Sequence, residues 1–183
     1  MPPCPPAKTP LHGYRMEKPC PGNRTMNQWR FFASGLFVLL LGCQPQPRPI
    51  HFGEELCAYC QMGISDPRFG AEIVTRQGRV FVFDALECMV EFERAGSIPT
   101  EQIHSRWVID FSQPGKLIAV EAAEFVFTPQ IHSPMGLNVY ALPQGRYEHD
   151  TVLPRGRKLT WQEVVELVRA QWREGPPRGS PMP

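Results

Sequence analysis

Several features that would point to common functions are missing from this sequence of 183 residues. The formal net charge is only +1, so there is no electrostatic argument for binding nucleic acid. The sequence has no G-x-S-x-G motif of a serine hydrolase and no glycine-rich loop of the kind that cradles phosphates. Its longest apolar run is too short to span a bilayer. These absences disfavour nucleic-acid binding, serine hydrolysis, nucleotide binding and a membrane-spanning helix.

The beginning of the chain has the composition of an export signal. Residues 1–25 are rich in proline and lack apolar periodicity, so they are expected to be unstructured. From Met26 a short polar stretch with one positive charge precedes an almost unbroken apolar run, Phe31–Leu41, which has the length of a signal-peptide core. We therefore interpret residues 1–25 as an over-long gene start and residues 26–42 as a lipoprotein signal peptide.

The signal segment ends in Leu40-Leu41-Gly42-Cys43, which resembles a bacterial lipobox. This resemblance implies cleavage before Cys43 and lipidation of its sulfur. The alternative is an ordinary secretory signal followed by an incidental cysteine. Cleavage and lipidation would leave three thiols, an odd number that disulfides alone cannot use: Cys57, Cys60 and Cys88. In an oxidising compartment, at least one of them would then need another purpose.

The rest of the chain has room for one ordinary domain between a tether and a tail. Prolines alternate with other residues over 44–51, which predicts a stiff, extended tether covering residues 43–56. The domain is expected over residues 57–174, in halves of about 57–112 and 113–174. Residues 175–183 are glycine, proline and serine with little to bury, so a disordered tail is predicted there.

The first half of the domain predicts the order strand, strand, helix, strand. Ala71–Arg76 and Arg79–Phe83 are rich in β-branched and aromatic residues and flank Gln77-Gly78, which is typical of a two-residue hairpin loop. A helix is then expected to begin at Asp84 with the capping box Asp84-x-x-Glu87 and to end at Gly96. Its apolar and charged residues separate onto two faces: Ala85, Cys88, Met89 and Phe92 against Glu87, Glu91 and Arg94. Alternation of Trp107, Ile109 and Phe111 predicts the last strand.

The second half predicts a looser copy of the same order. Leu117–Val120 is expected to be a short strand, Ala122–Phe127 is ambiguous between helix and strand, and Asn138–Leu142 is a clearer strand. A final helix is expected to begin at the capping box Thr160-x-x-Glu163. Its buried face would consist of residues at helical spacing: Trp161, Val164, Val165, Val168 and Trp172.

Sulfur ligands are the residues with the most distinctive chemistry. The stretch Cys57-Ala58-Tyr59-Cys60-Gln61-Met62 holds two thiols and a thioether, and Cys88-Met89 follows downstream. Thiolates and thioethers are soft ligands that select Cu(I), whereas oxygen ligands suit harder ions. Residues i and i+2 of a non-helical segment can point the same way, so Cys60 and Met62 can share one ion. The pattern predicts a Cu(I) site, for which His132 and Met135 are further possible donors.

These residues also allow interpretations other than a copper site. Zinc usually takes four ligands, and the sequence has no second Cys-x-x-Cys. Haem attachment needs histidine where Gln61 stands, and a thioredoxin-like motif should precede a helix, whereas the following glycines and proline suit a loop. A structural Cys57–Cys60 disulfide stays an alternative. Cys88 and Met89 are equally explained as core residues, and His132 as an exposed loop residue.

Taken together, these motifs resemble the NosL family, the copper-binding lipoproteins accessory to nitrous oxide reductase. The similarity covers roughly residues 54–145, and the family usually has glycine where this chain has Gln61. The matching pieces follow one another in the family's order: Cys57-x-x-Cys60-x-Met62-x-Ile64-x-Asp66, Phe69-Gly70-Ala71-Glu72-Ile73, Phe83-Asp84-x-Leu86-x-Cys88-Met89, Val108-Ile109-Asp110-Phe111 and Ser133-Pro134-Met135-Gly136.

The resemblance implies a fold, a function and a site. The fold is α+β, with two small strand-strand-helix-strand units forming one compact domain, distantly like organomercurial lyase. The function is that of a lipid-anchored periplasmic Cu(I) metallochaperone, not an enzyme. It would deliver copper through an ABC-type membrane complex for assembly of the copper centres of nitrous oxide reductase in denitrification. Cys60 and Met62 lead the ligand candidates, followed by Met89, Cys57, Cys88, His132 and Met135.

Three alternative functions remain at this point. One is a thiol-dependent lyase of organomercurials, which needs two thiols and a carboxylate, and another is a dithiol oxidoreductase. The third is a copper storage or resistance lipoprotein, because storage and delivery require the same ligands. The expected location is the periplasmic face of a bacterial membrane. Gln44 is not the aspartate associated with inner-membrane retention, which favours the outer membrane.

Overall fold

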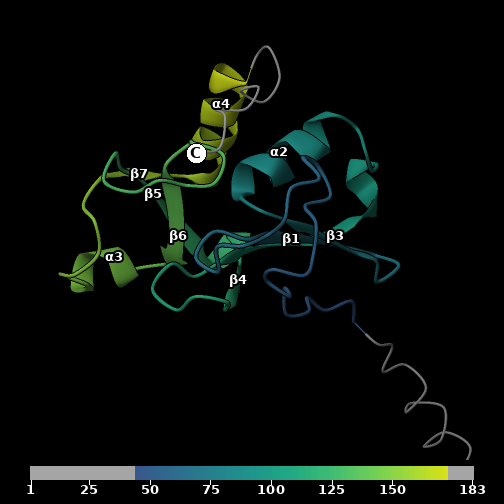
Figure 1. Cartoon of the computed structure of the whole chain (residues 1–183), viewed down its shortest axis with the longest axis horizontal. Coiled ribbons are helices and arrows are strands. Elements are labelled where there is room, and N and C mark those ends of the chain that lie inside the picture. The colour runs from purple at the N-terminus through teal and green to yellow at the C-terminus, as the bar shows by residue number, and fades with distance from the viewer. Residues whose placement is uncertain (1–43, 173–183) are drawn as a thin grey trace, which may run out of the picture. The chain divides into compact units, whose positions relative to one another are not determined.

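Two small antiparallel sheets, each with helices packed beside it, make up the part of the chain that the structure describes. The structure is a computed structural model, and it describes residues 44–172 (Figure 1). The predicted unstructured start, the predicted signal peptide, Cys43 with its predicted lipidation and the predicted tail lie outside the described residues. Among residues 44–172, no helix has both the length and the apolar character needed to cross a membrane.

The first sheet has four strands in the order β2-β1-β3-β4. Their bounds are β1 Ala71–Thr75, β2 Val80–Phe83, β3 Ile103–Ile109 and β4 Leu117–Ala119. Helix α2 (Leu86–Arg94) packs against β1 and β2, and a short 3₁₀ helix, Thr100–Gln102, leads into β3. The predicted order of strand, strand, helix and strand is confirmed for this unit.

The β1–β2 hairpin has a longer loop than its sequence suggested. Thr75 N donates to Arg79 O and Gly78 N donates to Thr75 O, so the loop has the three residues between Thr75 and Arg79. Gly78 has φ of 80°, the left-handed conformation that such a loop requires. The predicted two-residue loop is therefore wrong. It would have paired Arg79 with Arg76, whereas Arg79 pairs with Thr75.

The second sheet has three strands in the order β6-β5-β7. It comprises β5 Ala123–Phe127, β6 Val139–Pro143 and β7 Arg157–Leu159, with the short helix α3 (Arg146–His149) between the last two strands and α4 (Trp161–Gln171) after them. A 3₁₀ helix, Val120–Ala122, joins β4 to β5. The ambiguous segment is thus a strand, and the longer helix of this unit, α4, follows all three strands.

The strand at Leu117–Ala119 belongs to the first unit and not to the second. It pairs with β3, with Trp107 opposite Ala119. Its assignment to the second half is therefore wrong. The sequence of a three-residue strand does not indicate which other strand it will pair with.

The start of α4 and the end of α2 are as the sequence predicts. In α4 the Thr160 side chain accepts from Glu163 N, and the Glu163 side chain accepts from Thr160 N, so the predicted capping box is confirmed. At the end of α2, Gly96 has φ of 67° and the amides of Gly96 and Ser97 donate back to the carbonyls of Glu93 and Phe92. This is a Schellman ending, which glycine favours. The start of α2 differs and is described with the site.

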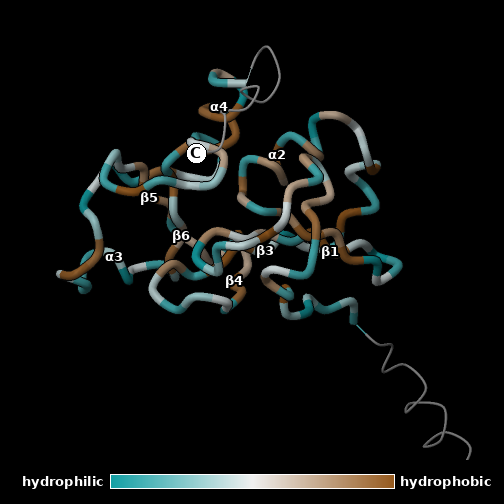
Figure 2. Tube along the Cα trace, viewed as in Figure 1, coloured by the Kyte–Doolittle hydropathy of each residue, from teal (hydrophilic) through white to brown (hydrophobic). Residues whose placement is uncertain are grey.

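Both sheets contribute to one hydrophobic core. Apolar residues of β1, β3, β5, β6 and the inner faces of α2 and α4 are buried together, and Figure 2 shows hydrophobic residues along β1 and on one side of α4. The sheets meet where Asp110 pairs with Ala141 and Phe111 N donates to Ala141 O. The α+β class with two small units is confirmed.

The segment before the thiols lies against the first sheet. Arg48 N donates to Glu72 Oε1 of β1 over 3.1 Å, the Arg48 guanidinium pairs with Glu55, and Ile50 is buried. The Ile50 side chain lies directly against Gly70, where an added Cβ would come within 2.9 Å of it. From Arg48 onward the predicted tether is therefore wrong, and residues 48–55 are a strap held by the domain.

Candidate metal centre

Residues Cys57–Met62 form a closed loop, named here the thiol loop. Leu56 and Gly63 pair as an isolated antiparallel bridge, and Cys57 N donates to Met62 O over 2.8 Å. Ala58 N donates to Val82 O over 2.9 Å, which fastens the loop to β2. Both ends and one side of the loop are thus fixed by backbone hydrogen bonds, and its side chains have defined positions relative to α2.

Gln61 gives the thiol loop its bend. Its φ is 64°, a conformation that residues other than glycine rarely adopt, and its side-chain amide donates to the carbonyls of Cys57 and Ala58, both over 3.2 Å. This is the position where the resembling family usually has glycine. The segment from Cys60 to Met62 is non-helical, as expected, and it bends at the left-handed Gln61.

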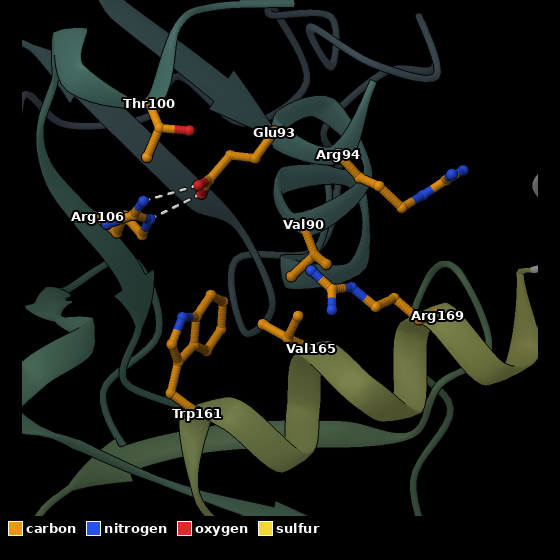
Figure 3. Close-up of a pocket in the computed structure, with 8 residues that line it drawn as sticks. All are labelled: Val90, Glu93, Arg94, Thr100, Arg106, Trp161, Val165 and Arg169. Carbon is orange, nitrogen blue, oxygen red and sulfur yellow. Dashed lines mark hydrogen bonds and ion pairs between the residues drawn. The ribbon is translucent and has the colours of Figure 1, made fainter. Parts of the chain in front are cut away.

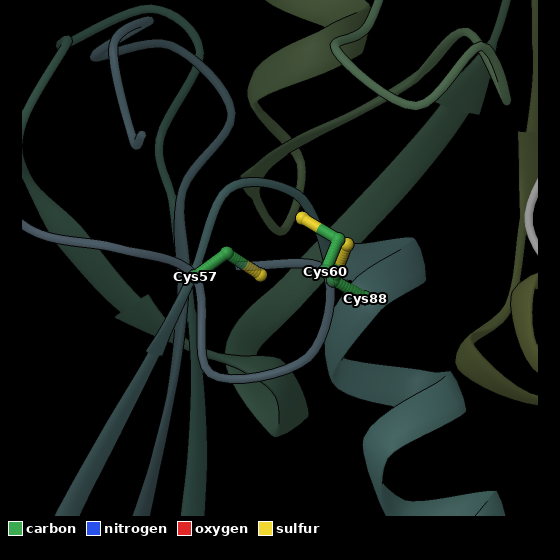
Figure 4. A group of neighbouring side chains, drawn as sticks. All are labelled: Cys57, Cys60 and Cys88. Carbon is green, nitrogen blue, oxygen red and sulfur yellow. The ribbon is translucent and has the colours of Figure 1, made fainter. Parts of the chain in front are cut away.

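Folding brings three thiols together. The sulfur atoms of Cys57, Cys60 and Cys88 all lie within 4.8 Å of one another (Figure 4). A typical bond from zinc to a thiolate sulfur is about 2.3 Å, so three sulfurs around one ion lie about 4 Å apart. The cluster is therefore close to the geometry that one bound ion requires. All three are free thiols; Cys57 and Cys88 are buried, and Cys60 is partly exposed.

Hydrogen bonds to sulfur polarise the cluster. The Cys88 thiol donates toward Cys57, and the backbone amides of Asp84, Cys60 and Tyr59 donate to Cys57 as well, which together lower the pKa of the Cys57 thiol to about 5 despite its burial. Cys88 also lowers the pKa of Cys60, and its own pKa is raised because it is the shared donor. A thiolate is the form that binds metal, so the site is prepared for a soft cation.

Asp84 does not cap α2. The helix begins at Leu86 after Ala85, which has an extended backbone, and no side chain caps it. The Asp84 carboxyl is buried instead, near Cys57 and the Ser65 amide, and burial followed by the charge of Cys57 raises its pKa to about 7. Its Oδ1 has no hydrogen-bond partner among the described residues. The predicted capping box is wrong, because Asp84 points toward the thiol loop.

Glu87 and Glu91 are buried, so the predicted polar face of α2 is wrong at both positions. Glu87 Oε1 accepts hydrogen bonds from Ser133 Oγ over 2.9 Å and from Leu137 N over 3.1 Å. Burial raises the pKa of Glu87. Glu91 is paired with Arg94. Glu87 therefore holds the loop that carries His132 and Met135 against the helix that carries Cys88.

The remaining predicted ligands lie in different environments. Met89 is fully buried in α2, Met62 is 48% exposed, Met135 is half-buried, and His132 is exposed. His132 is not part of the three-thiol cluster. As metal ligands, these four residues stay predictions.

The fold and the cluster define a class: a small α+β domain with a three-cysteine site that could hold a metal ion. No protein-family model and no curated protein matches the chain. Among solved structures, the chain is similar to the copper chaperone NosL from Shewanella denitrificans, at 20% sequence identity and a TM-score of 0.54, over 65% of this chain and 95% of that one. At this identity the likeness shows a shared fold, so the NosL-like fold implied by the sequence is confirmed.

Proposed function

We propose that this protein is a metallochaperone that binds one Cu(I) ion through Cys57, Cys60 and Cys88. The observation that carries the proposal is the convergence of three free thiols within 4.8 Å. Thiolates select Cu(I) over harder ions, and a structural zinc site would need a fourth ligand. The likeness in fold to a protein described as a copper chaperone supports the same assignment.

The unequal exposure of the thiols suits transfer of the ion. Cys57 and Cys88 are buried, whereas Cys60 is partly exposed at the edge of the thiol loop. A ligand from a partner would therefore reach the ion on the Cys60 side, and Cys60 would be the first of the three thiolates to leave. Cys88, whose raised pKa keeps it protonated, must release its proton to bind copper, so loading and release of the ion are coupled to pH.

The cellular setting is part of the same proposal. Lipidation at Cys43 would anchor the chain at the periplasmic face of a bacterial membrane, and the outer membrane is favoured. The recipient would be nitrous oxide reductase, reached through an ABC-type membrane complex. The lipobox-like Leu40-Leu41-Gly42-Cys43 and the family resemblance support this setting.

An anaerobic titration of the reduced protein with Cu(I), against a competing cuprous chelator, tests the binding. We expect one tight equivalent in the wild type and an affinity at least tenfold lower in Cys57→Ser, Cys60→Ser and Cys88→Ser. Met62→Leu, on the same loop, distinguishes a thiol-only site, in which it has little effect, from one that includes the thioether. Failure of the wild type to compete with the chelator would remove the copper proposal.

A second experiment separates delivery from storage. In cells that lack this gene, nitrous oxide reductase should be purified with less copper, and the wild-type gene should restore the copper where Cys60→Ser does not. A reductase with a full copper content in those cells would favour storage or resistance.

One observation favours a second candidate, an organomercurial lyase. Asp84 lies beside Cys57 with an unpaired carboxyl oxygen, so two thiols and a carboxylate converge. In such a reaction the thiolates bind mercury, the protonated carboxyl gives its proton to the leaving carbon, and the carbon–mercury bond breaks. Release of benzene from phenylmercuric acetate, lost in Asp84→Asn, would replace the chaperone proposal with this one.

A further inference from the structure

A second concave site lies away from the thiols, between α2, β3 and α4. It is a cleft of about 190 Å³ (Figure 3). Its apolar lining comes from Val90 of α2 and from Trp161 and Val165 of α4. The Trp161 ring packs against Phe125 with ring centroids 5.4 Å apart, and this contact fixes the position of the indole ring. Sites for drug-sized molecules are about 300–1,000 Å³, so this cleft suits a ligand of side-chain size.

Arginines surround this apolar lining, but they are not equivalent. Arg106 donates from Nε and Nη2 to the two carboxyl oxygens of Glu93, over 2.8 and 2.7 Å, which neutralises both groups. Arg94 is paired with Glu91 and extends away from the cleft in Figure 3. Arg169 forms no ion pair within residues 44–172, and its guanidinium reaches back over Val165 toward Val90.

We propose that this cleft binds a carboxylate attached to a small apolar group. The guanidinium of Arg169, which has no ion-pair partner among residues 44–172, offers two parallel N–H donors to a carboxylate, and the Thr100 side chain adds a polar group to the lining. The ring of Trp161 and the two valines then cover the apolar part of the ligand. Arg169 is exposed to solvent, so the preference for an anion comes from its charge-assisted hydrogen bonds to the carboxylate, which a neutral amide cannot form in the same way.

The carboxylate has two chemical sources, a free small acid and an acidic side chain on a partner protein. The cleft is linked to the thiol site through both of its helices. Helix α2 carries Cys88, and Trp172, directly after α4, stacks on Tyr59 of the thiol loop with centroids 6.4 Å apart. A ligand in the cleft would therefore contact the helix that carries Cys88 and the helix whose following residue stacks on the thiol loop. The inference uses no thiol, so it stands or falls separately from copper binding.

The test is an NMR titration of the purified protein that follows the indole N–H of Trp161 and the Nε–H of Arg169. The probes are phenylacetate, its neutral analogue phenylacetamide, and the blocked tripeptide acetyl-Leu-Glu-Leu-amide. The variants are Arg169→Gln and the matched control Arg146→Gln, an exposed arginine on α3. We expect saturable shifts with phenylacetate and none with phenylacetamide. Arg169→Gln should weaken binding about tenfold or more, and Arg146→Gln should leave it unchanged.

The two carboxylate probes identify the source. Tighter binding of the tripeptide than of phenylacetate assigns the cleft to an acidic side chain of a partner, and the reverse assigns it to a free acid. The proposal is overturned if neither carboxylate gives saturable shifts, if phenylacetamide binds as well as phenylacetate, or if Arg169→Gln retains the wild-type affinity.

Discussion

Gln61 adopts a backbone conformation that glycine takes freely and other residues take at a cost. With φ of 64°, a β-branched residue at this position would be strained by roughly 1–2 kcal/mol. We expect Gln61→Val to lower the free energy of unfolding by about that amount. Gln61→Gly loses two side-chain hydrogen bonds but relieves the strain, so it should stay within about 1 kcal/mol of the wild type. Urea denaturation measures both, and equal stability of the two variants would contradict this account.

The sequence predicted the residues of the candidate site better than their arrangement. The spacing Cys57-x-x-Cys60 is visible in the sequence, which indicates Cys88 only as a further candidate. Its contact with the other two depends on how α2 packs against β1 and β2, and no local pattern reports that packing.

At the residue scale, the main difference from the sequence prediction is that two carboxyl groups expected at the surface are buried. Asp84 and Glu87 match a capping box by spacing, but both side chains point to tertiary partners, the thiol loop and the loop after β5. Spacing alone cannot distinguish a helix cap from a carboxylate that a distant segment satisfies. The orphan oxygens of Asp84 and Glu87 became visible only in three dimensions.

The elements that were predicted well are those whose signals are local. The start of α4 depends on Thr160 and Glu163 alone, and the end of α2 depends on Gly96. The elements that were predicted poorly depend on distant partners. Leu117–Ala119 pairs with β3, and residues 48–55 are held by Glu72, which is buried on β1. A proline-rich composition predicts stiffness but says nothing about what the segment lies against.

Burial of Glu72 on β1, where the strap covers it, makes stability depend on pH. Burial raises the pKa of Glu72 from its usual 4.5 to about 7, and its Oε2 has no hydrogen-bond partner among the described residues. The folded protein therefore keeps a proton that the unfolded chain releases. The contribution of Glu72 is present below pH 4.5, falls as the pH rises to about 7, and is constant above that value.

Glu72→Gln should remove this fall, since glutamine has the shape of the protonated acid. We expect the variant to be more stable than the wild type at pH 8 by up to about 3 kcal/mol, and to match it near pH 4. Glu54→Gln, an exposed glutamate in the same strap, is the control and should show no such difference. Denaturation curves at several pH values give the comparison. A Glu72→Gln variant less stable than the wild type at pH 8 would mean that the carboxylate is ionised and stabilising.

At the scale of the whole molecule, the thiol site distinguishes the folded chain from the unfolded one. Cys57 and Cys60 stay close in sequence after unfolding, so the unfolded chain still offers a dithiol to copper. Cys88 joins them only when α2 packs against the strands beside the thiol loop. A ligand stabilises the folded state only to the extent that it binds that state more tightly than the unfolded one. The stabilisation by Cu(I) therefore measures what the third thiol contributes.

We expect one equivalent of Cu(I) to raise the midpoint of thermal unfolding of the wild type and to raise that of Cys88→Ser much less. Each tenfold preference for the folded state adds about 1.4 kcal/mol, or roughly 4–7 °C for a domain of this size. Anaerobic thermal unfolding followed by circular dichroism, with each protein's own metal-free midpoint as the baseline, gives the two differences. Equal increases would show that copper is held by the loop dithiol alone, because a third ligand supplied by folding must make the folded state bind more tightly.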